Sequence, residues 1–264
     1  MAVKQRKKGE WVRQFHPSSE NAIRLVVFPH AGGSASYYYP MSQALTPDIE
    51  VLALQYPGRQ DRRSEPCIEN IPDLADGVYD ALLPRLTAPG PYLFFGHSMG
   101  SIVAFEVARR CQQRLGGGPV HLIASGYPAP SRIPAGTVHL RDDAGVVREL
   151  REVGGTDPAW LDDADLLAAI MPTVRGDYRA IETHTYRPGP PLDCPITMLV
   201  GDQDPHTDAA QADAWREHTA AAFAQRVFPG GHFYLEEHQE EVVEMISGII
   251  RNSLRFVSTD GSHS

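Results

Sequence analysis

Apolar and polar positions alternate along this chain with two different periods. Short runs of apolar, β-branched or aromatic residues predict buried strands, whereas apolar residues spaced by three and four predict amphipathic helices. Strands and helices in alternation predict an α/β fold, with a mostly parallel central sheet flanked by helices. The predicted strands lie at 23–28, 50–54, 92–95, 119–126, 195–200 and 225–228. The predicted helices lie at 37–45, 73–86, 102–115 and 236–255.

The pattern changes between residues 127 and 187, where the sequence is helical, charged and interrupted by glycine and proline, with no convincing strand. An insertion of this length between two core strands predicts a helical lid. The chain is then a single domain whose core comprises about 11–126 and 188–256. Within the insertion, Arg175 and Asp177 are expected to form ordinary surface ion pairs. The alternative is that they hold the lid together or border the pocket.

The composition and net charge limit which kinds of binding partner the protein can have. The chain has 264 residues, of which 42% are hydrophobic, as expected for a packed globular protein. Its net charge of −9 argues against nucleic-acid binding. The sequence contains no run of about 18 apolar residues, which predicts that no segment spans a membrane.

The sequence at the ends of the chain and the pattern of cysteines indicate the cellular compartment of the protein. Residues 1–10 are basic and polar without an apolar stretch, so they do not resemble a secretion signal. These residues and residues 257–264 are expected to be flexible tails. Cys67, Cys111 and Cys194 are scattered, with no C-x-x-C pair. They favour a reducing cytoplasm over a disulfide framework or a zinc site.

The most informative motif is Gly96-His97-Ser98-Met99-Gly100, which fits G-x-S-x-G and lies between a predicted strand and a predicted helix. This context is typical of a nucleophile elbow, where the serine sits on a strained turn and glycines let the helix pass close to the strand. Ser98 then stands at a helix N-terminus, where free N–H groups stabilise negative charge. A chance pattern in a glycine-rich chain is the alternative, and the flanking strand and helix argue against it.

Two later loops supply candidates for an acid and a base. Asp202 and Asp204 follow the predicted strand 195–200, and His232 lies in a glycine-rich loop near the end of the chain. Serine, acid and histidine occur in this order in α/β-hydrolases. Asp204 is favoured over Asp202, since the acid usually lies a few residues beyond the last glycine of the strand. A metal site around His232 is disfavoured, because the spacing of its acidic neighbours matches no standard site.

A glycine-rich loop, Pro29 to Ser34, follows the first predicted strand. Such a loop can expose N–H groups to a ligand, and in α/β-hydrolases this position supplies half of the oxyanion hole. The expected oxyanion donors are therefore the backbone N–H groups of Ala31 and Met99. A plain turn is the alternative, and no G-x-x-x-x-G-K follows that would indicate a phosphate loop. His30 and His97 are expected to pack or to form hydrogen bonds, not to act as the base.

Three arginines, Arg59, Arg62 and Arg63, lie in the loop after the predicted strand 50–54. In a parallel sheet this loop lies near the carboxyl ends of the strands, on the same side as the predicted site. The arginines are candidates for recognising an acidic partner or a phosphate. A solvated loop is the alternative.

Together these motifs resemble those of type II thioesterases, the discrete editing thioesterases of polyketide and nonribosomal peptide assembly lines. The resemblance extends from Trp11 to about the last helix, and it implies the α/β-hydrolase fold, a Ser98–His232–Asp204 triad and no cofactor. It also implies a cytoplasmic enzyme that hydrolyses stalled or wrong acyl groups from the phosphopantetheine arm of acyl or peptidyl carrier proteins. A monomer is expected by default. The motifs that carry the resemblance are Phe28-Pro29-His30-Ala31-Gly32-Gly33, Tyr56-Pro57-Gly58-Arg59, Gly96-His97-Ser98-Met99-Gly100, Gly201-Asp202-Gln203-Asp204-Pro205 and Gly230-Gly231-His232-Phe233-Tyr234.

Three other interpretations stay open. A general carboxylesterase or lipase, or a medium-chain fatty acyl thioesterase, would use the same fold and triad. An acyl transferase of the malonyl-transferase type also uses Gly-His-Ser-x-Gly, but it would have neither the late Gly-Asp-x-Asp nor the Gly-Gly-His loop. A catalytically silent module that only binds a carrier protein is the non-enzymatic alternative, and the presence of Ser98, Asp204 and His232 argues against it.

Overall fold

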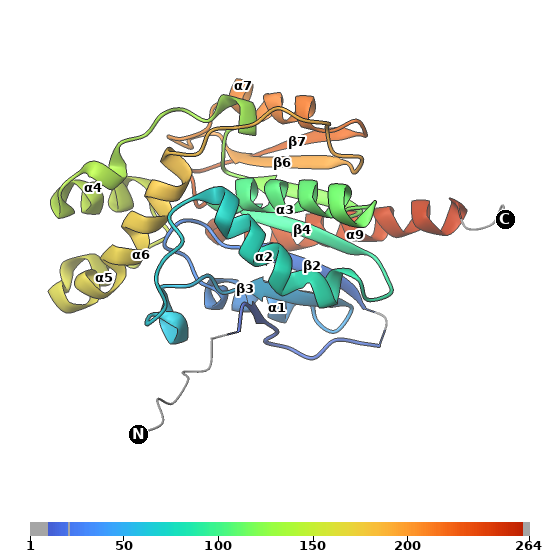
Figure 1. Ribbon diagram of the computed structural model, residues 1–264, viewed down its shortest axis with the longest axis horizontal. Helices are drawn as coiled ribbons and strands as arrows, with labels where there is room; N and C mark the ends of the chain where they lie inside the picture. Colours follow the sequence, from blue (N-terminus) through green and yellow to red (C-terminus); the bar gives the residue numbers. More distant parts are fainter. Residues whose placement is uncertain (1–9, 21, 261–264) are drawn as a thin grey trace.

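The computed structural model describes residues 10–20 and 22–260, and these contain one sheet of seven strands (Figure 1). The strands are β1 Val12–Arg13, β2 Ile23–Phe28, β3 Ile49–Leu54, β4 Tyr92–His97, β5 His121–Ser125, β6 Ile196–Gly201 and β7 Phe223–Phe228. Their order across the sheet is β1-β3-β2-β4-β5-β6-β7. Neighbouring strands are parallel, except that β1 pairs antiparallel with β3. The sheet is therefore of the mostly parallel type that needs helices on both faces.

Helices cover both faces of this sheet (Figure 1). The α-helices are α1 Tyr39–Leu45, α2 Ile71–Leu86, α3 Met99–Leu115, α4 Asp143–Val153, α5 Pro158–Asp162, α6 Ala164–Glu182, α7 Ala209–Asp213, α8 Tyr234–Glu237 and α9 Gln239–Asp260. The 3-10 helices are η1 Ala35–Tyr38, η2 Gln60–Arg62, η3 Pro130–Arg132, η4 Val138–Leu140 and η5 Ala214–His218. Helices α2 and α3 pack together on one face, and α1 and α9 pack together on the other. Helices α4, α5 and α6 lie together beyond the sheet, at the left in Figure 1.

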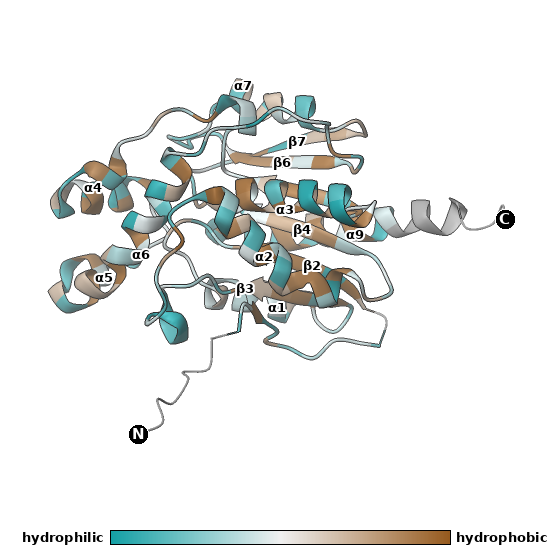
Figure 2. Ribbon diagram, in the orientation of Figure 1, coloured by the Kyte–Doolittle hydropathy of each residue, from teal (hydrophilic) through white to brown (hydrophobic). Residues whose placement is uncertain are grey.

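The core has two hydrophobic layers, because successive residues of a strand point to opposite faces of the sheet. Val26 and Phe94 pack with the residues of α2 and α3, whereas Val27 and Phe95 pack with those of α1 and α9. Figure 2 shows hydrophobic residues concentrated on the strands and hydrophilic residues on the outward sides of α2 and α3. All six residues of β2 are buried as a result.

The strand order of the sheet reverses at β2. The chain continues from β2 to β3 on one side and then returns to β4 on the other side. The loops that follow β2 and β4 therefore leave the same edge of the sheet and diverge, which is where ligands bind in open α/β sheets. Phe28 lies opposite Gly96 in the register of these strands. The loop that carries Ala31 therefore begins beside the G-x-S-x-G turn.

The predicted α/β architecture is confirmed, with differences at single elements. Strand β1 is absent from the prediction, because two residues carry no periodic signal. The last predicted helix, 236–255, is interrupted, since α8 ends at Glu237 and α9 begins at Gln239. Between β5 and β6 the chain forms η3, η4, α4, α5 and α6 and no strand. We call this segment, residues 127–187, the insertion.

The ends of the chain fall largely outside the structure. Of the predicted tails, residues 1–9 and 261–264 lie outside the described residues, and residues 257–260 belong to α9. Within 10–20 and 22–260, no helix has the length and apolar character needed to cross a membrane.

Helix α3 lies against the strands with no room for a side chain at two glycines. A Cβ atom added to Gly96 would overlap the backbone of Gly100 and Ser101, and one added to Gly100 would overlap the carbonyl group of Phe28. The obstacles are backbone atoms, which cannot rotate away as side chains can. The two glycines of G-x-S-x-G are therefore required by the packing of α3 on β2 and β4.

We expect Gly100→Ala to lower the free energy of unfolding by about 3 kcal/mol or more, the upper end of the usual cost of overpacking. Urea denaturation measures this change. Gly117→Ala is the matched control, because nothing lies within 4 Å of the added Cβ atom, and it should change stability by less than about 0.5 kcal/mol. Equal stability of the two variants would contradict the tight contact of α3 with β2.

Candidate active site

Ser98 occupies the turn between β4 and α3. Its backbone has φ 54° and ψ −127°, a conformation that a non-glycine residue rarely adopts. Its N–H donates to the carbonyl oxygen of Ser125, the last residue of β5, at 2.7 Å. The side chain is 9% exposed. A strained, supported turn at the first residue before a helix is the geometry that the sequence motif predicts.

Asp204 and His232 meet beside this turn. The loop after β6 carries Asp204 and the loop after β7 carries His232, and Asp204 Oδ2 lies 2.9 Å from His232 Nδ1. The two side chains are 0% and 2% exposed. Asp202 is exposed, and its Oδ1 accepts the N–H of Gly230 at 2.9 Å instead. The structure thus brings Asp204 to His232 and leaves Asp202 to support the loop that precedes His232.

A cavity of about 410 Å³ joins these groups to the expected oxyanion donors. Ser98, His232, Ala31 and Met99 all line it. Among the described residues, the N–H groups of Ala31 and Met99 have no hydrogen-bond partner, so both are free to bind an anion. No hydrogen bond joins Ser98 to His232 within that part of the chain. Such bonds are often long in unliganded sites and shorten when substrate binds.

His30 and His97 are buried near His232. Burial lowers the pKa of His30 to about 3 and holds the pKa of His97 well below its usual value. Both rings are therefore neutral at neutral pH. Nδ1 of His97 lies 2.9 Å from Ser125 Oγ, and the ring centroids of His97 and His232 lie 4.9 Å apart. His97 therefore forms a hydrogen bond, and His30 packs edge-to-face against the ring of Tyr37, as the sequence predicts.

Residues of the insertion form most of the remaining cavity wall. They are Tyr127, Pro134, Ala135, Gly136, Thr137, Val138, Arg141, Glu149, Leu150, Glu152, Val153, Gly154, Thr156, Tyr178, Ile181 and Glu182. The wall is therefore partly polar, and three of its members are glutamates. Among the described residues, no group of three or more His, Cys, Asp and Glu side chains is arranged to hold a metal ion.

An ion pair crosses this wall between the insertion and the loop that carries Asp204. Glu149, on α4, lies with Oε2 2.7 Å from Nη1 of Arg141 and with Oε1 3.2 Å from Nε2 of His206. The backbone N–H of His206 donates to Asp204 Oδ1 at 2.9 Å. No motif in the sequence predicts that Arg141, Glu149 and His206 contact one another. The place of His206, two residues after the acid, is the one local signal that points to it.

The electrostatics of this pair favour its charged form. Burial by itself lowers the pKa of His206, but the hydrogen bond and charge of Glu149 outweigh it, so the pKa lies above 6.5. For Glu149, the hydrogen bond from His206 lowers the pKa more than burial raises it, so the pKa lies below 4.5. The contact therefore strengthens when His206 is protonated.

Burial removes two of the three candidate docking arginines from the surface. Arg59 is 6% exposed and pairs with Asp177, which is 1% exposed, at 2.8 Å. Arg62 is 1% exposed, pairs with Glu65 at 2.7 Å and lies over the ring of Trp11. Arg63 is exposed and forms no ion pair with any described residue. Only Arg63 stays a candidate for contact with a partner.

The expectation for Arg175 and Asp177 is half right. Arg175 forms an exposed ion pair with Asp143 of α4, at 2.6 Å. Asp177 faces the other way and reaches Arg59 in the core. The same helix, α6, places Ala180 and Ile181 in the core layer of α2 and α3. The second half of α6 is therefore packed into the body of the protein, whereas Leu150, Leu161 and Met171 form a separate small cluster.

Comparison with known proteins identifies the class of protein to which this chain belongs. Residues 23–250 match the family described as thioesterase domain, so the chain belongs to the thioesterase family. Its fold is the α/β-hydrolase fold, and the family consists of hydrolases of thioesters.

Several similar proteins are named for biosynthetic pathways. A protein named as a probable cadicidin biosynthesis thioesterase of Streptomyces griseus is 50% identical over 232 residues, which are 88% of this chain and 63% of that protein. Thioesterase PikA5 of Streptomyces venezuelae is 46% identical over 239 residues, 90% of this chain and 85% of the relative. The solved structure of the type II thioesterase BorB from the borrelidin biosynthetic cluster matches with a TM-score of 0.84 and 45% identity, covering 90% of this chain and 96% of that one.

The geometry of the acid predicts unequal effects of two substitutions. Asp204→Asn should lower kcat by about 10⁴-fold, the loss known for the corresponding change in a serine protease. Asp202→Asn should lower kcat far less, because the exposed Asp202 side chain accepts the backbone N–H of Gly230 and not a proton of His232. Steady-state hydrolysis of a thioester by the two purified variants measures the difference. A larger loss for Asp202→Asn would identify Asp202 as the acid.

The ion pair of Glu149 and His206 should make stability depend on pH. Because the pKa of His206 is raised on folding, its contribution is complete below about 6.5 and is lost as the pH rises through the folded value. Because the pKa of Glu149 is lowered, its contribution is present above about 4.5 and is lost as the pH falls. His206→Gln should therefore cost most stability between these two values, and the cost should fall as the pH rises through the folded pKa of His206. Urea denaturation of both proteins across this range measures the cost, and a cost that does not change with pH would contradict the pair.

Proposed function

We propose that this protein is an editing thioesterase that hydrolyses stalled or wrong acyl groups from the phosphopantetheine arm of acyl or peptidyl carrier proteins. The observation that carries the proposal is the contact of Asp204 with His232 in the cavity that Ser98 also lines. The free N–H groups of Ala31 and Met99 in that cavity support it. Relatives that include a type II thioesterase of a biosynthetic cluster support the biosynthetic setting.

The first half of the reaction transfers the acyl group to the enzyme. His232 Nε2 takes the proton of Ser98 as Oγ attacks the thioester carbonyl carbon. Asp204, bound to Nδ1, orients the ring and stabilises its cation. The N–H groups of Ala31 and Met99 bind the oxygen that becomes negative, a contribution of several kcal/mol in such sites (about 2.7–4 for one donor). The carbon–sulfur bond breaks, and the thiol leaves with the proton from His232.

The second half releases the product. Water attacks the ester carbonyl of acyl-Ser98 while His232 takes its proton, and the same two N–H groups bind the oxyanion. The carboxylic acid leaves and Ser98 regains its hydrogen. This sequence uses no cofactor or metal ion.

The acyl group occupies the cavity beneath the insertion, which acts as the lid of the site. The three cysteines form no disulfide bond, as expected for an enzyme that acts in the reducing cytoplasm. The enzyme acts as a monomer that meets its carrier at the mouth of the cavity.

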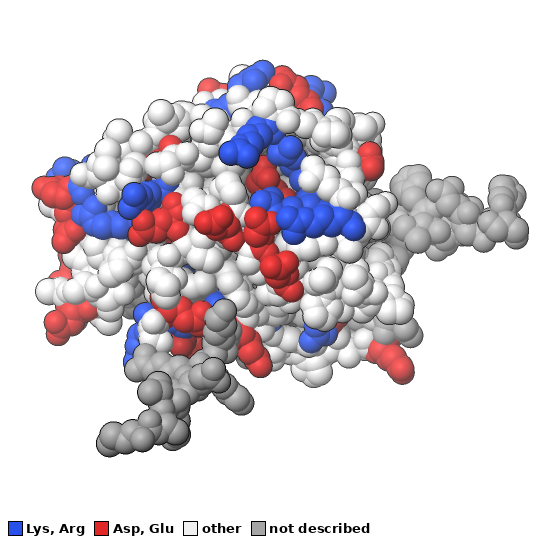
Figure 3. Space-filling view, viewed as in Figure 1, with Lys and Arg blue, Asp and Glu red and all other residues white. Residues whose placement is uncertain are grey.

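An acidic carrier cannot be attracted by the net charge, because that charge is −9. Figure 3 shows basic side chains gathered over α3. Those of Arg109, Arg110 and Arg114 are ion-paired with Asp76 and Glu106, so the cluster is largely compensated. Arg63, exposed in the loop near the carboxyl ends of the strands, is the docking residue that we propose.

One experiment tests substrate, nucleophile and docking residue together. The same acyl group is presented on a carrier protein, on coenzyme A and as a simple oxygen ester, at two ionic strengths. The wild type should give the highest kcat/KM with the carrier, and Ser98→Ala should have no turnover and no labelling by a fluorophosphonate. Arg63→Ala should lower kcat/KM for the carrier by up to about fivefold at low salt, since exposed ion pairs contribute about 0.2–1 kcal/mol.

The control for Arg63→Ala is Arg114→Ala, an exposed arginine on α3 whose loss should leave the carrier reaction unchanged. Equal kcat/KM for carrier and coenzyme A would contradict the carrier substrate. A preference for the oxygen ester would favour a carboxylesterase, and turnover by Ser98→Ala would contradict the nucleophile. A carrier preference that survives both high salt and Arg63→Ala would keep the function and reject Arg63 as its docking site.

A further inference from the structure

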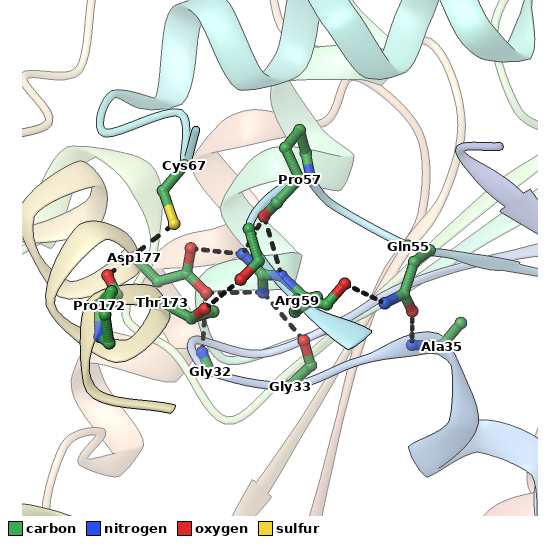
Figure 4. Close-up of polar contacts among 11 residues, drawn as sticks. Gly32, Gly33, Ala35, Gln55, Pro57, Arg59, Cys67, Pro172, Thr173 and Asp177 are labelled. Carbon is green, nitrogen blue, oxygen red and sulfur yellow. Dashed lines mark hydrogen bonds and ion pairs between the residues drawn. The ribbon is translucent and has the colours of Figure 1, made fainter. Parts of the chain in front are cut away.

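A side chain from the insertion holds the loop that carries Ala31. Asp177, on α6, accepts the N–H of Gly32 at Oδ2, at 2.8 Å (Figure 4). That N–H belongs to the peptide unit directly after Ala31. Gly32 has φ +74°, in the left-handed region that glycine adopts most readily. The carboxylate thus holds the central peptide unit of a turn that is closed by the N–H of Gly33, which donates to the carbonyl oxygen of His30 at 3.0 Å.

Arg59 holds the same loop from its other side. Nη1 donates to Asp177 Oδ2 and to the carbonyl oxygen of Gly33, at 2.8 and 2.9 Å, and Nη2 donates to Asp177 Oδ1 at 2.8 Å. One buried ion pair therefore binds both the N–H of Gly32 and the C=O of Gly33. The two parallel N–H to oxygen bonds are the arrangement in which a guanidinium fits a carboxylate best.

The loop that carries Arg59 is itself fixed. The carbonyl oxygen of Pro57 accepts from Nε and Nη2 of Arg59 at 3.3 Å. Gln55 accepts the N–H of Ala35 at 2.8 Å and donates to the carbonyl oxygen of Arg59 (Figure 4). The loop after β2 is therefore tied to the loop after β3 directly at Gly33 and Ala35, and through Asp177 at Gly32.

Helix α6 is docked on this arrangement at more than one point. Thr173 Oγ1 donates to the carbonyl oxygen of Gly58 at 2.6 Å, and Cys67 Sγ donates to that of Pro172 at 3.8 Å. These contacts place Asp177, one helical turn further on, within reach of Gly32. The position of the carboxylate is thus determined by the packing of α6 and not by a mobile surface segment.

We propose that Asp177 and Arg59 are positioning residues for the reaction, which set the direction of the Ala31 N–H in the oxyanion hole. This inference rests on the proposed function, since it takes that N–H as an oxyanion donor. The pair acts through the loop and does not touch the substrate. Arg59 also neutralises Asp177, so that the carboxylate behind the loop does not oppose the negative charge that develops on the substrate oxygen.

The first test separates positioning from substrate binding. Asp177→Asn should lower kcat by about 10- to 100-fold, because donors displaced by about 1 Å lose most of their effect. KM should change by less than about twofold, since the pair does not contact the substrate. Arg59→Lys keeps the charge without the paired bonds, so its loss of kcat should be smaller than that of Arg59→Gln. All rates are expressed per folded enzyme.

The matched control is Glu65→Gln. It breaks the ion pair of the equally buried Arg62, in the same loop, without touching the segment from Gly32 to Ala35. It should keep kcat even if it lowers stability. A second variant, the double substitution Arg59→Met and Asp177→Leu, removes both charges together, so it should fold with no unpaired buried charge and still have the low kcat.

Two inhibitors provide the decisive readout. A trifluoromethyl ketone analogue of the acyl-pantetheine forms a tetrahedral adduct with Ser98 and needs the oxyanion hole, whereas an uncleavable thioether analogue needs only the cavity. Asp177→Asn should weaken the ketone by the same factor as kcat and leave the thioether unchanged. Unchanged kcat in folded Asp177→Asn, or equal weakening of both inhibitors, would overturn the inference. Full activity of Ser98→Ala would instead overturn the proposed function.

Discussion

Helix α3 can begin directly behind Ser98 only because no side chain separates it from the sheet. At Gly96 and Gly100 the space that a Cβ atom would take is filled by backbone. This contact determines the strained backbone turn at Ser98. The strain costs about 1–3 kcal/mol, and the burial of α3 offsets this cost. The contact also determines where the N–H of Met99 points and how near the loop after β2 can come. The positions of the other residues of the proposed site follow from parallel pairing, because the loops after β2, β4, β6 and β7 all leave one edge of the sheet.

The groups that could be predicted from sequence are those whose place follows from local pattern. Ser98, Asp204 and His232 each lie just beyond a predicted strand, and parallel strands bring such positions to one edge. The sequence order and the glycines around these residues are therefore enough to predict that they lie at one edge of the sheet. The same reasoning separates Asp204 from Asp202, which the 2.9 Å contact with His232 supports.

The charged contacts could not be predicted, because burial of a charge depends on what packs over it from elsewhere in the chain. Arg59 and Asp177 are 118 positions apart, and each lies among other charged residues, as surface residues do. Glu149 and His206 are likewise brought together only by the way the insertion folds back. Breaking such a buried pair by removing one partner typically costs about 3–5 kcal/mol, yet nothing in the residue order near either partner indicates this.

The insertion supplies most of the cavity wall, while the loops after the strands supply the proposed catalytic residues. This division makes the insertion the natural unit to exchange between homologues when a chimaeric enzyme with another acyl range is wanted. Asp177 makes that exchange conditional. A donor segment without a carboxylate at this place would leave the guanidinium of Arg59 in the interior with no counter-charge and the N–H of Gly32 with no acceptor. A crossover placed before Thr173 would carry α4, α5 and their side of the cavity from the donor and leave the last turns of α6 with the parent.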